Sequence, residues 1–109
     1  MRRSFQVAGT TFRPKGDILE AFAMAETGQA EVKFVLEPDN KFDPHAVQVF
    51  IENVLVGYVP RLNARHVGKI ISGENGLGMQ NVIVKPVGNT ANKPNPGFVI
   101  ELFYDKTEE

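Results

Sequence analysis

Basic side chains recur at every fourth position in one stretch of the sequence: Arg61, Arg65 and Lys69. Residues four apart share one face of a helix. The spacing therefore predicts a row of three cations on a helix and on the turn that enters it. Such a row can neutralise two or three phosphates. A solvated helix face has the same pattern, so the spacing alone leaves both interpretations open.

Two loops each combine an aromatic ring with a charged side chain or an amide. The residues are Phe12 and Arg13 in the first loop, and Asn40, Lys41, Phe42 and Asp43 in the second. Rings at such positions can stack on nucleic-acid bases. An Asn can hydrogen-bond a base edge, and an Arg can pair with a phosphate. The same rings, like that of Tyr58, can instead fill the core beneath the loops.

The sequence contains no catalytic motif. His45 could join Asp39 and Asp43 around a metal, but their spacing is not that of a calcium loop, and a zinc site would need more His or Cys. The glycines of 73–78 are not followed by the Lys-Ser or Lys-Thr of a phosphate-binding loop, and no serine stands in a G-x-S-x-G motif. We therefore expect no enzyme, no cofactor and no metal. A metal-dependent hydrolase built on Asp39, Asp43 and His45 is the weaker alternative.

Alternating and periodic apolar residues predict six short strands and two short helices. The strands are expected at 4–10, 30–36, 46–51, 54–59, 79–87 and 98–104, and the helices at 17–28 and 63–72. Asp17 and Asn63 would cap the helices, and Glu52-Asn53 would form a hairpin turn. The fold class is therefore mainly β with two helices, as a small, mostly antiparallel barrel.

Length and composition exclude several classes of protein. The 109 residues are enough for one domain, with a core at about 5–104 and a charged tail at 105–109. A formal net charge of -1 excludes a strongly basic nucleic-acid binder but allows a small basic patch. The absence of cysteine excludes disulfides and thiol nucleophiles. Without an apolar stretch near the ~20 residues of a spanning helix, we expect a soluble, cytoplasmic protein with no membrane partner.

Three segments together resemble the HIRAN domain: Val7–Phe12 (VAGTTF), Leu36–Val49 (LEPDNKFDPHAVQV) and Val56–Arg61 (VGYVPR). The middle segment is the most specific, and the third supports the order and spacing. The resemblance extends from about Phe5 to Tyr104. The sequence is similar to stand-alone, bacterial members of the family. The resemblance also relates the chain to the N-terminal DNA-binding domain of the helicase-like transcription factor.

This resemblance implies an OB-like β-barrel that binds the 3′ end of single-stranded DNA, in DNA repair, fork remodelling or DNA processing. It also implies a role for each matching residue. Phe12 and Phe42 would stack on terminal bases, Asp43 would accept a hydrogen bond from the 3′-hydroxyl, and Asn40 would lie near the terminal nucleotide. Gly57 and Tyr58 would lie at the edge of the pocket, Arg61 near the phosphates, and Phe103 would add a ring from the last strand.

The proposed acid would make such a pocket selective. An Asp near phosphates is repelled unless it meets a donor. A terminal hydroxyl donates and a terminal phosphate does not, so Asp43 would select a free 3′-hydroxyl end. The sequence departs from the family at Thr11-Phe12-Arg13, where a tyrosine pair follows a basic residue in well-studied members, and at Phe42, which is not tyrosine. Stacking survives these changes, whereas phenol contacts to phosphates do not.

Two classes of function follow from these observations. The first is a module that binds single-stranded DNA and has no small-molecule substrate. Because the sequence shows no helicase or nuclease segment, it would act with such a partner protein or alone as a sensor of strand ends. The second is a protein–protein interaction module on the same barrel that has lost DNA binding. Basic side chains that converge around Phe12 and Phe42 would favour DNA, and an apolar patch there would favour a protein partner.

Overall fold

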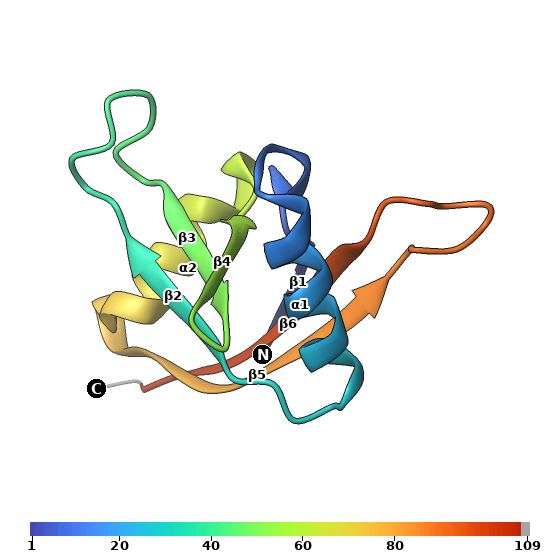
Figure 1. The fold of residues 1–109 in the computed structure, drawn as a ribbon. Coiled ribbons are helices and arrows are strands. Elements are labelled where there is room, and N and C mark those ends of the chain that lie inside the picture. Colours follow the sequence, from blue (N-terminus) through green and yellow to red (C-terminus); the bar gives the residue numbers. More distant parts are fainter. Residues whose placement is uncertain (108–109) are drawn as a thin grey trace.

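The computed structural model describes residues 1–107 and contains two three-stranded antiparallel sheets and two helices (Figure 1). In spatial order, one sheet holds β1 (Arg2–Gln6), β6 (Gly97–Lys106) and β5 (Leu77–Val87), and the other holds β2 (Val32–Leu36), β3 (Val47–Ile51) and β4 (Val54–Tyr58). The helices are α1 (Lys15–Glu26) and α2 (Arg61–Ser72), with short 3-10 helices η1 (Thr10–Phe12) and η2 (Glu74–Gly76). The six expected strands are therefore confirmed, in a mixed α/β fold.

The six strands do not close into the expected small barrel within the described residues 1–107. One isolated bridge joins the sheets, where Ala8 and Tyr58 exchange backbone hydrogen bonds of 2.8 and 2.9 Å. Pairing does not continue because Gly9, at φ 78°, turns the chain into η1, and Pro60 follows β4. Each helix packs against strands of both sheets, α1 against β4 and β5, and α2 against β5 and β3.

The core is formed by the inward sides of the strands and by one face of each helix. Alternate residues of β6 and β3 are fully buried: Phe98, Ile100 and Leu102 in β6, and Val47, Val49 and Ile51 in β3. Val67 and Ile70 of α2 join them. Apolar alternation thus predicts the buried side of these strands, since successive side chains of a strand point to opposite faces.

Both helices begin earlier than the sequence suggested, directly after a proline. Pro14 and Pro60 occupy the N-cap positions, at φ -53° and -54°, and neither helix has a side-chain cap. Asp17 and Asn63 therefore lie inside the first turns. A proline φ near -65° leads readily into a helix and needs no amide hydrogen. The earlier start places Arg61 on α2 itself, so that Arg61, Arg65 and Lys69 share one helix face.

One expected turn is confirmed, and two expected irregular segments are partly regular structure. The hairpin turn between β3 and β4 is confirmed, because Glu52 and Asn53 have φ values of 48° and 73°, as a two-residue turn requires. The expected loop at 73–78 is instead η2 followed by the start of β5. Likewise β6 continues to Lys106, so the first part of the expected tail is strand. The end of that tail, 108–109, lies outside the described residues.

Candidate nucleic-acid interface

An open groove of about 420 Å³ lies where the β2–β3 loop, the junction between the sheets and the first turn of α2 meet. Figure 1 shows this loop and the start of α2 at the same end of the molecule as η1. The groove is lined by Ala8, Asn40, Phe42, Asp43, Ala46, Tyr58, Val59 and Arg61. We call it the Asp43 groove.

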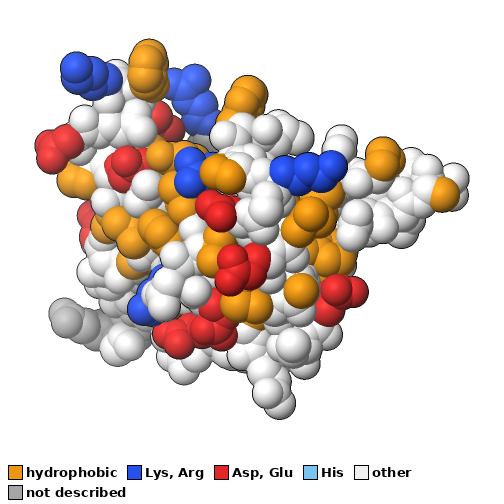
Figure 2. Space-filling view, viewed as in Figure 1, with side chains coloured by type: hydrophobic (Ala, Val, Ile, Leu, Met, Phe, Trp, Pro, Cys, Tyr) orange, Lys and Arg blue, Asp and Glu red, His pale blue; other side chains and the backbone are white. Residues whose placement is uncertain are grey.

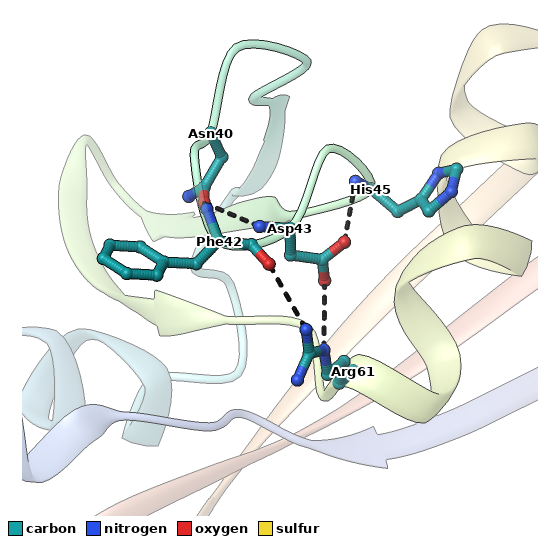
Figure 3. A network of polar contacts seen from close by, with 5 residues as sticks. All are labelled: Asn40, Phe42, Asp43, His45 and Arg61. Carbon is teal, nitrogen blue, oxygen red and sulfur yellow. Dashed lines mark hydrogen bonds and ion pairs between the residues drawn. The ribbon is translucent and has the colours of Figure 1, made fainter.

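Side chains within the β2–β3 loop fix its shape (Figure 3). Asn40 Oδ1 accepts the backbone N–H groups of Phe42 and Asp43, at 2.9 and 3.0 Å. Asp43 Oδ1 in turn accepts the backbone N–H of His45 at 2.9 Å. Asn and Asp commonly hold turns in this way. The amide oxygen of Asn40 is thus used inside the loop, and its Nδ2 is the group left to contact a ligand.

Arg61 connects this loop to α2. Its Nε lies 3.9 Å from Asp43 Oδ2, and its Nη2 donates to the backbone oxygen of Phe42 at 3.3 Å. The side chain of Arg61 is 79% exposed, whereas that of Asp43 is 21% exposed. An ion pair with so exposed a partner contributes little to stability. Arg61 can therefore turn to a ligand at little cost to the fold.

Three large apolar side chains face solvent on η1, the β2–β3 loop and the first turn of α2, and of these three only Phe42 lines the groove. Phe12 and Phe42 are 90% exposed and Leu62 is 97% exposed. Figure 3 shows the Phe42 ring directed away from the polar contacts of Asp43 and Arg61. In Figure 2, hydrophobic and basic side chains alternate along the upper edge of the molecule. The two phenylalanines are thus not core residues, and their faces are free to stack.

Tyr58 is half-buried in the wall of the groove. The adjacent Glu37 carboxylate favours the protonated phenol and raises the pKa of Tyr58 above its ordinary 10.0, and burial adds to this rise. Glu37 Oε1 is itself buried, with no hydrogen-bond partner among residues 1–107. Tyr58 therefore remains a neutral phenol in the groove. Sequence reasoning missed this effect of Glu37 because strand pairing brings the two residues together.

Gly57 lies behind the groove and does not line it. A Cβ at this position would lie 2.2 Å from the backbone oxygen of Ala8 and 2.8 Å from Val7 Cγ1. Only glycine therefore lets β4 approach the end of β1 closely enough for the bridge between Ala8 and Tyr58 to form. The role of Gly57 in the site is indirect, since it sets the position of Tyr58.

The sequence model of the HIRAN domain matches residues 3–102, nearly the whole chain. The chain belongs to the HIRAN domain family. HIRAN domains are generally DNA-binding modules, typically without catalytic activity. Searches of the curated proteins and of the solved structures gave no match.

The geometry of this HIRAN domain separates the remaining expected site residues from the Asp43 groove. Lys41 is exposed on the β2–β3 loop. Arg13 donates from Nε to the backbone oxygen of Leu55 at 3.3 Å and lines another cavity. Arg65 and Lys69 line a further groove on the opposite side of the β2–β3 loop. The groove thus brings together Asn40, Phe42, Asp43, Tyr58 and Arg61.

Phe103 does not line the Asp43 groove. It lies in β6, paired with Arg2 and Asn81. The strand reaches the groove near Phe98, whose backbone oxygen accepts the N–H of Val7 at 2.9 Å. Phe103 is five residues further along, or about 17 Å in an extended strand. The ring expected in the last strand is therefore remote from the Asp43 carboxylate.

The HIRAN domain has no group of three or more His, Cys, Asp or Glu side chains that could hold a metal ion within residues 1–107. Asp39, Asp43 and His45 do not converge, because Asp43 accepts the backbone N–H of His45 while the imidazole ring points away from the carboxylate (Figure 3). In the same part of the chain, no helix is both long and apolar enough to cross a membrane.

Proposed function

We propose that this HIRAN domain binds single-stranded DNA and recognises its free 3′-hydroxyl end in the Asp43 groove. The observation that supports this most directly is the position of the Asp43 carboxylate. It lines the groove with the Arg61 guanidinium 3.9 Å away and the exposed Phe42 ring nearby. The three groups offer an acceptor for a hydroxyl, a cation for a phosphate and a surface for a base.

Asp43 retains the capacity to accept a further hydrogen bond. A carboxylate has about four acceptor sites, and the backbone N–H of His45 uses one on Oδ1. A 3′-hydroxyl would donate to a remaining site. A 3′-phosphate would instead bring negative charge against the carboxylate, which repels it. The domain would therefore prefer the hydroxyl end.

Arg61 would bind the phosphate nearest the end. Its guanidinium has five N–H donors, of which one contacts the Phe42 oxygen. Binding through phosphate contacts weakens as the salt concentration rises. On a single strand, each contact adds about -0.7 to the slope of log K against log salt concentration. We therefore expect binding that is strongest at low ionic strength.

Phe12 and Phe42 would stack on the terminal bases, which is possible because their rings face solvent. Asn40 Nδ2 would donate to the base or sugar, and the oxygen of the neutral Tyr58 hydroxyl would accept a hydrogen bond from it. In this proposal the domain detects strand ends without catalysis or a cofactor, and a helicase or nuclease partner in DNA repair or processing acts on them.

Fluorescence anisotropy tests the proposal. Two strands of one sequence, both labelled at the 5′ end, would carry either a 3′-hydroxyl or a 3′-phosphate. We expect the hydroxyl strand to bind about tenfold more tightly, as a hydrogen bond to a charged acceptor allows. D43N should remove the preference, because its oxygen can still accept from His45 while the charge is gone. D39N, in the same loop, is the matched control and should keep the preference.

Equal binding of both strands by the natural sequence would contradict end recognition and leave a general single-strand binder. No binding by folded protein would exclude DNA. The exposed Phe12, Phe42 and Leu62 would then be assigned to a protein partner.

A further inference from the structure

A second groove, of about 290 Å³, runs along the other side of the β2–β3 loop. Its loop side includes Pro38, Pro44 and His45, and its helix side includes Arg65, Gly68 and Lys69. We call it the α2 groove. The β2–β3 loop separates the two grooves, because Phe42 and Asp43 line the Asp43 groove and Pro44 and His45 line the α2 groove.

The basic face of α2 connects the two grooves. Arg61 lines the Asp43 groove, whereas Arg65 and Lys69 line the α2 groove. Successive members are about 6 Å apart along the helix axis, four residues at 1.5 Å each. This is the scale of the spacing between phosphates in an extended single strand. Within residues 1–107, neither Arg65 nor Lys69 has a carboxylate within ion-pair distance.

We propose that a DNA strand whose 3′ end occupies the Asp43 groove continues past Arg61 into the α2 groove, where Arg65 and Lys69 bind two consecutive phosphates. This inference rests on the proposed function. The prolines of the loop give the groove an apolar wall for a sugar or base. Glu74 also lines this groove. Its carboxylate repels a further phosphate, so the path ends near Lys69.

Gly68 keeps the α2 groove open. Glycine destabilises a helix interior relative to alanine, and here the backbone does not require it. A Cβ at Gly68 would lie 3.5 Å from Leu36 Cδ2, an ordinary contact distance. Alanine would therefore fit, at the expense of space between Arg65 and Lys69.

Another basic cavity offers an alternative path. It has a volume of about 330 Å³ and is lined by Arg13 and Lys15 together with the β5–β6 loop at Pro94, Asn95 and Pro96. Its Arg13 is already bonded to the Leu55 oxygen. The α2 path is favoured because Arg61 belongs both to the Asp43 groove and to the basic row.

The test is the dependence of affinity on strand length. The strands would be a dinucleotide and an octanucleotide, both ending in a 3′-hydroxyl, measured by competition in fluorescence anisotropy over a range of salt. For the natural sequence we expect the octanucleotide to bind more tightly. In the double variant R65A/K69A, octanucleotide affinity should fall by about 100-fold, tenfold for each contact. Its salt slope should decrease by about 1.4, and dinucleotide affinity should not change. K33A, which removes an exposed lysine beside the β3–β4 turn, is the control for loss of a surface charge away from the α2 groove.

The outcomes separate the two proposals. If the natural sequence prefers the 3′-hydroxyl but R65A/K69A leaves octanucleotide affinity and salt slope unchanged, the α2 path is wrong and end recognition stands. If K15A removes the length dependence instead, the strand follows the cavity at Arg13, which also overturns the inference. If the natural sequence binds neither strand, both proposals fail. Circular dichroism would verify that each variant is folded.

Discussion

Asp43 and Arg61 oppose each other at the groove, with Asp43 Oδ2 3.9 Å from Arg61 Nε. This separation is too long for a hydrogen bond, so each group keeps its capacity for a ligand. Together they carry no net charge. A terminal nucleotide presents the complementary pair, a hydroxyl that donates and a phosphate that is negative. A chain with a net charge of -1 can therefore offer a suitable site for a strand end without a large basic surface.

Removal of the exposed rings should weaken DNA binding without loss of stability. F12A and F42A should each cost about 1–3 kcal/mol of binding free energy to a single strand, the range for one stacked base. The free energy of unfolding should change by less than about 0.5 kcal/mol, because both rings are 90% exposed. Anisotropy and thermal melts measure the two effects.

The matched control for the rings is L62A, since Leu62 is equally exposed on the first turn of α2 and cannot stack as a ring does. Its DNA affinity should match that of the natural sequence. An equal loss of affinity in all three variants would show that apolar contact, not base stacking, carries the binding.

The substitution G57A should destabilise the fold. The added Cβ would lie 2.2 Å from the Ala8 oxygen, so β1 and β4 must move apart. We expect a loss of about 3 kcal/mol in the free energy of unfolding, at the upper end for overpacking, measured in urea. G16A in α1 is the control, because its Cβ meets nothing within 4 Å, and it should not destabilise. A loss below about 1 kcal/mol for G57A would mean that the bridge relaxes easily.

The substitution G68A should stabilise the protein. Alanine is favoured over glycine in a helix interior by about 1 kcal/mol, and the added methyl group makes an ordinary contact with Leu36. For a domain of this size, that gain corresponds to a rise in Tm of about 4 °C or more. Calorimetry measures it, with G16A as a second helical glycine for comparison. A lower Tm would show that the methyl group does not fit against Leu36.

His66 should make stability depend on pH. Its Nε2 lies 3.2 Å from the Tyr104 hydroxyl, and burial lowers the pKa of His66 below its ordinary 6.5, with further lowering by the charges of Arg3 and Lys69. The unfolded chain then binds a proton more readily than the folded one. This contribution to stability is present above pH 6.5 and is lost as the pH falls through the lowered pKa.

Urea unfolding between about pH 7 and about pH 5 tests this dependence. H66Q should flatten the decline in unfolding free energy at acid pH. H45Q, which changes the exposed histidine of the β2–β3 loop, should leave it as steep as in the natural sequence. If the unfolding free energy of H66Q falls with acid pH as steeply as that of H45Q, other groups govern the acid sensitivity.

Much of the fold was predictable because alternation reports burial directly. Phe98, Ile100 and Leu102 alternate in the sequence and are all buried in β6. The helix starts were less predictable, since Asp17 and Asn63 have the residue types of caps but the preceding prolines take that position. Closure of a barrel depends on how far pairing between the sheets extends, and Gly9 stops it after one bridge.

The site was predictable where its residues lie close together in the sequence. Asn40, Phe42 and Asp43 share one loop and remain together in the groove. Phe103 depends on the register of a long strand, which residue types alone do not fix, and it lies elsewhere. The exposure of Leu62 was missed because the helix was expected to begin at Asn63. The helix begins at Arg61, and this start places Leu62 outside the buried helix face.

The bridge between Ala8 and Tyr58 has a mechanical consequence. Both residues line the Asp43 groove, and their mutual hydrogen bonds are the isolated bridge that joins the two sheets within residues 1–107. The groove therefore spans the junction between the two sheets. A strand end bound there would contact both sheets at once and hold them together. Its binding energy would appear as slower hydrogen–deuterium exchange at the amides of Ala8 and Tyr58, which join the two sheets.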